Sequence, residues 1–192
     1  MRPTYDEALV ALSSRLSERA LSHSVRVADE AASLADTYGV DVDAARLAGL
    51  LHDWHRETPA AVLIERAREM GLMVTDVDLA VPYLLHGPVA AVDLADEFPG
   101  LGDDVRSAVA AHTYGASVMS DLAMVVYIAD VIEPKRHHAT VGDIREAVGT
   151  VTLRELFVRA YAASFRHLID ARLHVHPSTV ATWNAALTMD ES

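Results

Sequence analysis

Apolar residues recur at three- and four-residue intervals along almost the whole chain, and this spacing limits the fold more than any other feature. One stripe over residues 16–38 consists of Leu16, Ala20, His23, Val27, Ala31, Leu34 and Tyr38. Such spacing places side chains on one face of an α-helix, whereas a half-buried strand alternates apolar and polar residues. Because alternating runs are few, the chain is predicted to be all-α.

Capping residues and helix breakers divide this pattern into successive helices. Thr4 and Glu7 have the spacing of a capping box, and Thr58 with Pro59 is typical of a helix start. A first helix is expected after Thr4, and a second is expected to end at Gly39. Further helices are expected from Asp41 through Trp54, from Thr58–Pro59 to Gly71, from Gly87–Pro88 to Phe98, over 102–113, 120–133, 141–148 and 152–173, and over a short stretch after Pro177. With neither a linker nor a repeat, residues 1–192 are expected to form one helical bundle.

The composition narrows the classes of protein that this chain can belong to. It has 192 residues, of which 51% are hydrophobic and none is cysteine, so disulfides, thiolate nucleophiles and sulfur-ligated zinc are excluded. The net charge of −12 argues against a general affinity for nucleic acid or anionic membrane. No apolar run is long enough for a membrane span, and the start does not resemble a signal peptide. A soluble, cytoplasmic protein is therefore expected.

Asp130 is the polar residue whose position is most unusual. It follows a near-continuous apolar run, Leu122–Ala129, in a helix that should lie at the centre of the bundle because it is hydrophobic all round. A buried carboxylate without partners costs several kcal/mol, and a cation, hydrogen bonds or protonation can remove that cost. Lys135 and Arg136 lie beyond Pro134, so a metal ion is at least as plausible a partner.

Other histidines and an aspartate also lie on or beside apolar faces. The set of metal-ligand candidates is His23, His52, Asp53, His86, His112 and Asp130. Leaving out the adjacent pair His52-Asp53, successive candidates are separated by 29, 33, 26 and 18 residues. Each interval equals about one helix plus a turn or a helical hairpin. Four imidazoles and two carboxylates suit two metal ions that share a carboxylate, and nitrogen and oxygen donors favour Fe, Mn, Zn, Co or Ni over Ca or Mg. Spacing alone does not decide between this site and core polar residues that bond to the backbone.

The same residues resemble a known family. His23, then His52-Asp53, then Asp130 are similar to the HD-domain metal-dependent phosphohydrolase superfamily. The closer resemblance is to the YqeK family of symmetrical bis(5′-nucleosyl)-tetraphosphatases, which cut diadenosine tetraphosphate into two ADP. The similar blocks, which together cover about residues 15–187, are SHSVRVADEAASLADTYG (22–39), AGLLHDWHRE (48–57), LLHGPVAA (84–91), AAHTYG (110–115), IADVIEPKR (128–136) and HVHPSTVATWN (174–184).

The resemblance implies a role for each site residue. His23, His52, Asp53 and Asp130 would hold one metal, and Asp53 would bridge it to a second metal bound by His86 and His112. The family centre is di-iron, and Asp53 and Asp130 would be its catalytic carboxylates. The expected substrate contacts are Arg56, Gly87, Thr113, Lys135 and Arg136, with exposed backbone donors at Gly87. Relatives usually carry Lys where this chain has Arg56, while His55, His137, His138 and His167 are expected on the surface.

The expected chemistry is attack of a metal-activated water on phosphorus, with the arginines neutralising the phosphates. Glu133 is expected either to support a ligand or to balance the charge of Arg136. Three alternatives remain open from the sequence. The first is another HD phosphohydrolase, whose substrate is a nucleoside monophosphate, a deoxynucleotide or a guanosine polyphosphate. The second is a di-iron oxygenase, and the third is a non-catalytic helical sensing module. The expected ligand is a small nucleotide rather than nucleic acid or membrane, and a homodimer is also open.

Overall fold

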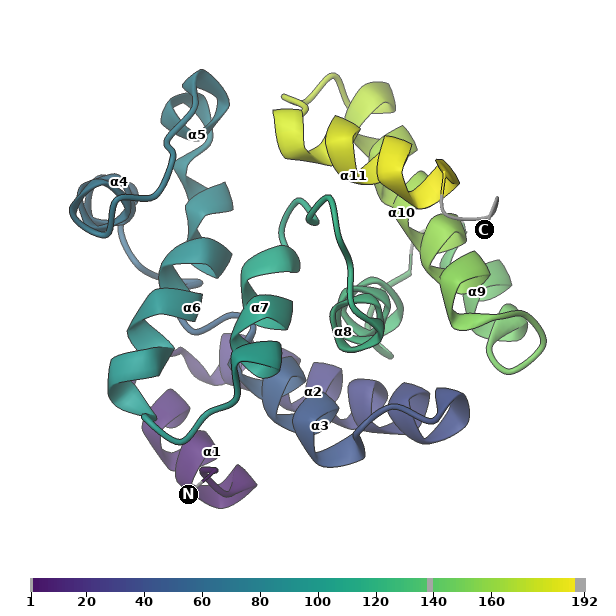
Figure 1. Ribbon diagram of the computed structural model, residues 1–192, viewed down its shortest axis with the longest axis horizontal. Coiled ribbons are helices and arrows are strands. Elements are labelled where there is room, and N and C mark those ends of the chain that lie inside the picture. The colour runs from purple at the N-terminus through teal and green to yellow at the C-terminus, as the bar shows by residue number, and fades with distance from the viewer. Residues whose placement is uncertain (1, 138–139, 189–192) are drawn as a thin grey trace.

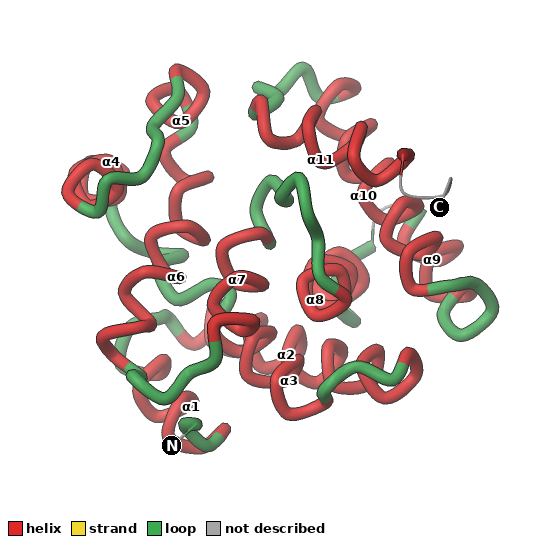
Figure 2. Tube along the Cα trace, viewed as in Figure 1, coloured by secondary structure: helices red, strands yellow, loops and turns green. Residues whose placement is uncertain are grey.

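The computed structural model describes residues 2–137 and 140–188, which form helices and loops without any strand (Figures 1 and 2). The all-α prediction is therefore confirmed. The helices are α1 (Tyr5–Ser13), α2 (Glu18–Tyr38), α3 (Val42–Leu51), α4 (Ala60–Glu69), α5 (Asp76–Ala80), the 3₁₀ helix η1 (Pro82–Leu85), α6 (His86–Glu97), α7 (Asp103–Ala111), α8 (Asp121–Ile132), α9 (Val141–Ala147), α10 (Leu153–Asp170) and α11 (Pro177–Thr188). Within these ranges no helix is both long enough and apolar enough to cross a bilayer.

Helix α8 is the central element, as its composition predicted. It packs against α2, α3, α7, α9 and α10, and Figure 1 shows it end-on between α7 and the C-terminal helices. Every residue from Leu122 to Ala129 is buried. Ser120 caps its start by accepting a hydrogen bond from the backbone N–H of Ala123. The helix therefore projects Asp130, in its last turn, from the centre of the core.

Helices α2 and α3 cross very closely because small residues meet at the crossing. A Cβ added to Gly49 would lie 2.9 Å from Ala28 Cα and 3.0 Å from the Val27 carbonyl oxygen. Only glycine leaves room for this backbone approach. The crossing brings His23, on α2, to the end of α3, where His52 follows.

Several helix boundaries follow the sequence signals, and others do not. The capping box of Thr4 and Glu7 is present, and Gly39 ends α2 with a left-handed φ of 70°. The expectation that the third helix runs through Trp54 is wrong, because regular helix ends at Leu51 and turns follow. Thr58 does not cap α4, since its hydroxyl lies 2.9 Å from His55 Nδ1 and Pro59 takes the cap position.

The segment between α4 and α6 contains two short helices that were not predicted. Helix α5 has five residues and η1 has four, too few for a repeating apolar face to be recognised. Because η1 leads directly into α6, that helix begins at His86, one residue before the predicted start at Gly87-Pro88. Helix α10 also ends earlier than predicted, at Asp170.

A buried polar cluster joins α5 to the segment that begins α11, two elements at the same end of the molecule (Figure 1). His176 Nε2 lies 3.3 Å from Asp78 Oδ2, and its ring stacks on Tyr114 with centroids 4.1 Å apart. His176 and Asp78 are 5% and 1% exposed. The cluster therefore fixes α11 relative to the loop after α7.

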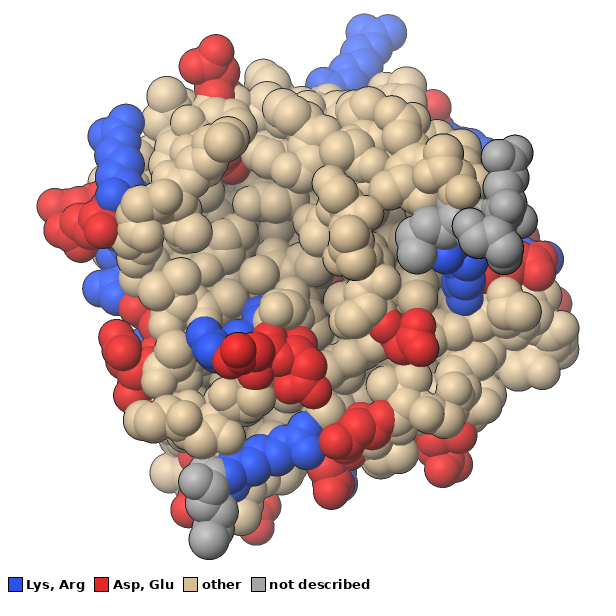
Figure 3. Space-filling model, viewed as in Figure 1, with Lys and Arg blue, Asp and Glu red and all other residues tan. Residues whose placement is uncertain are grey.

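Charged side chains of both signs are interspersed along the edges of the face in Figure 3, and the acidic excess forms no continuous patch on it. This face therefore has no single acidic surface, although the chain carries a net charge of −12.

Candidate metal centre

The six predicted ligand residues come together although five helices or helix ends supply them. His23 is on α2, His52 and Asp53 follow α3, His86 begins α6, His112 follows α7 and Asp130 is on α8. The structure contains two groups whose donor atoms all lie within 4.8 Å of one another. One group is His23, His52 and Asp130, and the other is His52, Asp53 and His112. The arrangement is dense enough to surround small cations.

Asp53 belongs to the second of these groups, and its two oxygens face different histidines. Oδ1 is 3.0 Å from His86 Nε2 and 3.7 Å from His112 Nε2. Oδ2 is 3.3 Å from His52 Nε2 and 3.6 Å from His23 Nε2. With its side chain 1% exposed, Asp53 has the position that a bridging carboxylate requires.

Three of the histidines are oriented in the same way by the helix turns that carry them. The Nδ1–H groups of His52, His86 and His112 donate to the carbonyls of Gly49, Tyr83 and Val109, at 2.7, 2.6 and 2.7 Å. Each partner lies three residues earlier in the chain. Because Nδ1 donates to a carbonyl in each case, each ring directs its Nε2 toward Asp53, the orientation of metal-binding histidines.

His23 is oriented by a carboxylate instead. Its Nδ1 lies 3.3 Å from Glu133 Oε1, and Glu133 is held by Arg26 Nε at 2.7 Å and by the Lys135 backbone N–H at 2.9 Å. Glu133 therefore supports a ligand candidate, and the charge that it balances is that of Arg26 rather than Arg136. His23 Nε2 reaches within 3.0 Å of Asp130 Oδ1.

The unpaired atoms of this cluster fit a metal centre better than a set of satisfied core residues. His23 Nε2, His52 Nε2 and Asp53 Oδ2 are buried without a hydrogen-bond partner. His86 Nε2 and His112 Nε2 lie 2.8 Å apart, although both rings carry their proton on Nδ1. Two lone pairs at this distance repel each other, and a cation beside both removes the repulsion.

The pKa shifts show the same electrostatic pattern. Burial lowers the pKa of His112 to about 4 and also lowers the pKa of His86, so both rings are neutral at pH 7. Burial opposes charge on His52, but Asp53 and Asp130 outweigh it and raise its pKa to about 9. Burial acts to raise the pKa of Asp53, yet the surrounding histidines bring it well below the ordinary value. Carboxylates that stabilise positive charge beside neutral imidazoles are the states that metal ions need.

Asp130 is less buried than its helix suggested. Its side chain is 22% exposed, and Arg136 Nη2 donates to its Oδ1 at 2.8 Å while Arg136 Nε donates to its backbone oxygen at 3.2 Å. Asp130 was expected to be buried and is instead partly exposed, because it lies where α8 reaches a cavity. Arg136 and His23 share Oδ1, and the arginine leaves Oδ2 available.

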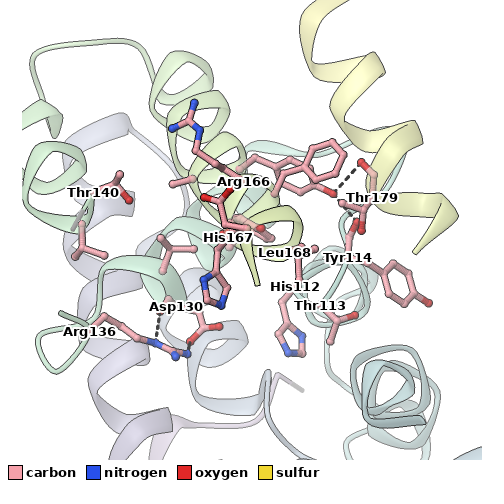
Figure 4. A pocket seen from close by; sticks show the side chains of 18 residues that line it. His112, Thr113, Tyr114, Asp130, Arg136, Thr140, Arg166, His167, Leu168 and Thr179 are labelled. Atoms are coloured by element: carbon pink, nitrogen blue, oxygen red, sulfur yellow. Dashed lines mark hydrogen bonds and ion pairs between the residues drawn. The ribbon is translucent and has the colours of Figure 1, made fainter. Parts of the chain in front are cut away.

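The cavity has a volume of about 490 Å³ and lies beside the cluster. Figure 4 shows Asp130 with Arg136 on one side of it and His112 with Thr113 on another. Thr113 Oγ1 is buried without a partner, so this hydroxyl is available to a ligand. The cavity lies within the size range of small-molecule sites, about 300–1,000 Å³.

The other expected substrate contacts have different outcomes. Arg56 Nη1 lies 3.5 Å from both oxygens of Asp53 and its side chain is 37% exposed, so it borders the cluster. The side chain of Lys135 is exposed and does not line the cavity. The expectation of exposed donors at Gly87 is wrong, since Gly87 is buried and a Cβ there would lie 3.0 Å from His112 Cε1. Its missing side chain makes room for the His112 ring.

The expectation of a surface His55 is also wrong. This residue is 7% exposed, and its Nε2 lies 2.6 Å from Asp93 Oδ2, while Arg66 pairs with the other Asp93 oxygen. It therefore ties the turn after α3 to α4 and α6. His137 is exposed as expected, and His138 lies outside the described residues.

Sequence reasoning did not identify several residues that line the cavity. His167, expected on the surface, is exposed but points into the cavity from α10 (Figure 4). Tyr114 and Tyr161 line it as well, and Tyr161 donates to the Tyr114 carbonyl at 2.7 Å. The AHTYG block that contains His112 is the only signal that pointed toward Tyr114, and α10 offered none.

Comparisons with known proteins identify the family of this chain. The HD domain family model matches residues 20–135. A symmetrical bis(5′-nucleosyl)-tetraphosphatase from Staphylococcus aureus is 34% identical over 178 residues, which cover 92% of this chain and 91% of the relative. Its namesake from Bacillus subtilis is 29% identical over 181 residues, which cover 93% and 95%.

A solved structure is similar over nearly the whole fold. It is a crystal structure from Clostridium acetobutylicum, described as a predicted HD superfamily hydrolase involved in NAD metabolism, with a TM-score of 0.88 and 33% identity. The match covers 98% of this chain and all of that one. From the family model and these near full-length relatives, it follows that the chain belongs to the HD-domain family and, within it, to the family of the symmetrical bis(5′-nucleosyl)-tetraphosphatases.

Proposed function

We propose that this protein is a metal-dependent phosphohydrolase that cleaves diadenosine tetraphosphate symmetrically into two ADP. The observation that carries the proposal is the position of Asp53, with one oxygen facing His86 and His112 and the other facing His23 and His52, beside a cavity of about 490 Å³. The names of the relatives supply the substrate. The reaction consumes one water and breaks the central P–O bond, so that each half leaves as ADP.

The ligand set is assigned in two parts. His23, His52, Asp53 and Asp130 would hold one metal ion, and Asp53, His86 and His112 a second. Bound there, such ions supply Lewis acidity toward phosphoryl oxygens and lower the pKa of a water molecule. We propose iron for both positions, because imidazole and carboxylate donors without sulfur suit it and the family resemblance points to it.

Side chains of the chain itself would bind and orient the phosphates. Arg136, fixed to Asp130, directs its guanidinium at the cavity, and a guanidinium binds phosphate through paired hydrogen bonds. The Thr113 hydroxyl can donate a further hydrogen bond. Arg56 contacts Asp53 and places a positive charge beside that carboxylate. This charge would offset the repulsion between the carboxylate and the anionic substrate. A nucleotide substrate is consistent with a cytoplasmic enzyme.

The decisive experiment combines metal quantification of the purified protein with hydrolysis of diadenosine tetraphosphate and identification of the products. We expect close to two metal ions per chain and ADP as the only nucleotide product. An Asp53→Asn variant should lose both the metal and at least 100-fold in kcat, whereas Asp43→Asn, at an exposed position near the start of α3, should lose neither. AMP with ATP as products, or full turnover without metal, would contradict the proposal.

A further inference from the structure

The substrate of the proposed reaction has two equal halves, whereas the cavity borders the metal cluster only at His112 and Asp130. Cleavage at the central bond places one nucleoside diphosphate on each side of the metal cluster. The cavity borders His112, Asp130 and Arg136, but neither Arg56 nor Tyr83 lines it. Its volume of about 490 Å³ is in the lower half of the range for small-molecule sites, about 300–1,000 Å³. The half of the substrate on the other side of the central bond therefore calls for a second surface within reach of the cluster.

An exposed aromatic ring lies in that position. Tyr83, on η1, is 39% exposed, and it is the only Phe, Trp or Tyr side chain in the exposed class within the described ranges. Its ring packs against the ring of His86, with centroids 4.5 Å apart. The Arg56 guanidinium carbon lies 4.8 Å from the centre of the same ring. Tyr83 thus contacts both a ligand candidate and the arginine that borders Asp53.

The chemistry of this pair suits a nucleotide. An aromatic ring and a guanidinium plane are the two protein groups on which nucleobases stack. Arg56 also carries the positive charge that a diphosphate requires, 3.5 Å from Asp53.

We propose that Tyr83 and Arg56 form the platform for the second nucleoside of the substrate: the base stacks on the exposed surface of this pair, and Arg56 binds the diphosphate of the same half. This inference rests on the proposed function, because it requires a substrate with two nucleosides. It makes Tyr83 a determinant of the preference for dinucleoside over mononucleoside polyphosphates.

The test measures equilibrium binding to the metal-loaded full-length protein by calorimetry. The dinucleoside probe is the diadenosine tetraphosphate analogue with a methylene group between the second and third phosphorus atoms, which cannot be cleaved there. The mononucleoside probe is ADP, whose tighter site is expected in the cavity. For Tyr83→Ala we expect about tenfold weaker binding of the dinucleoside probe, equivalent to about 1.4 kcal/mol, and less than twofold change at the tighter ADP site.

Two further variants separate stacking from packing against His86. Tyr83→Leu keeps an apolar side chain at this position and removes the aromatic face. It should therefore weaken binding of the dinucleoside probe as much as Tyr83→Ala does. Tyr83→Phe keeps the face and should bind like the wild type. Val92→Ala, at a 38% exposed position on α6, is the matched control, and metal content is measured for every variant.

The outcomes are distinct. Unchanged binding of the dinucleoside probe by both the alanine and leucine variants, or an equal loss for both probes, would overturn the role of Tyr83. The wild type is assayed first with diadenosine tetraphosphate itself, and a failure to produce ADP would overturn the proposed function before any variant is compared.

Discussion

At the level of single residues, the hydrogen bond made by Nδ1 of each histidine fixes the ring so that Nε2 faces the cluster. Three histidines use a backbone carbonyl three residues earlier, which any substitution that keeps the helix turn also keeps. His23 depends on the side chain of Glu133 instead. Among the four histidines, His23 is therefore the one whose orientation a single side-chain substitution elsewhere in the chain can disturb.

We expect Glu133→Gln to weaken metal binding by about 10- to 100-fold, the usual effect of losing a partner of a ligand histidine. Glutamine keeps the volume of this 3% exposed residue but removes the charge that holds the His23 and Arg26 side chains. Competition with a chromophoric chelator measures the change. Glu65→Gln, at an exposed position on α4, is the control. If Glu133→Gln bound metal as tightly as the control, His23 would not need this support.

The residues of the candidate site were predictable from sequence to a large extent, but their pairings were not. Each donor was recognisable because a polar side chain interrupts or flanks an apolar face, as Asp130 does after Leu122–Ala129. Whether Glu133 would pair with Arg26 or with Arg136 depends on how α2 crosses α8, and no local pattern contains that angle. For the same reason His55 was mistaken for a surface residue.

At the level of elements, long helices were predictable and short connections were not. Periodicity and capping residues identified α2 and α8, because several apolar turns and a cap reinforce one another. The end of α3 was misplaced because Trp54 stays buried after the helix has ended, so the apolar pattern continues across a change in backbone. That change is what turns His52 and Asp53, adjacent in sequence, toward the same cluster.

We expect Gly49→Ala to destabilise the protein by about 1–3 kcal/mol, the usual cost of overpacking a core. The new Cβ would lie 2.9 Å from Ala28 Cα, and backbone at both helices cannot yield as a flexible side chain would. Calorimetric unfolding measures the loss. Gly142→Ala, in α9, is the matched control, since nothing lies within 4 Å of its added Cβ and alanine favours a helix by about 0.5–1 kcal/mol. Equal melting temperatures for the two variants would rule out a close α2–α3 crossing.

At the scale of the whole molecule, the cluster lies where several helices that pack in one core come together. His23, His86 and Asp130 come from α2, α6 and α8, and the turn after α3 supplies Asp53. Without a cation, the core must enclose opposed nitrogen lone pairs and a carboxylate oxygen that lacks a hydrogen bond. Such groups favour opening of the structure, because water satisfies them in the unfolded chain.

Metal removal should therefore lower the melting temperature as well as the activity. A ligand at 100 times its dissociation constant stabilises the folded state by about 2.7 kcal/mol, which for a chain of this size corresponds to about 5–10 °C. Thermal unfolding with and without a chelator measures the difference, and restored metal should reverse it. A His86→Ala, His112→Ala double variant separates the two positions: if these histidines hold one of the ions, chelation should cost this variant fewer degrees than the wild type. If a chelator left the melting temperature of the wild-type protein unchanged, the buried donors would be satisfied without a metal ion. The cluster would then have a structural role and would not be a metal centre.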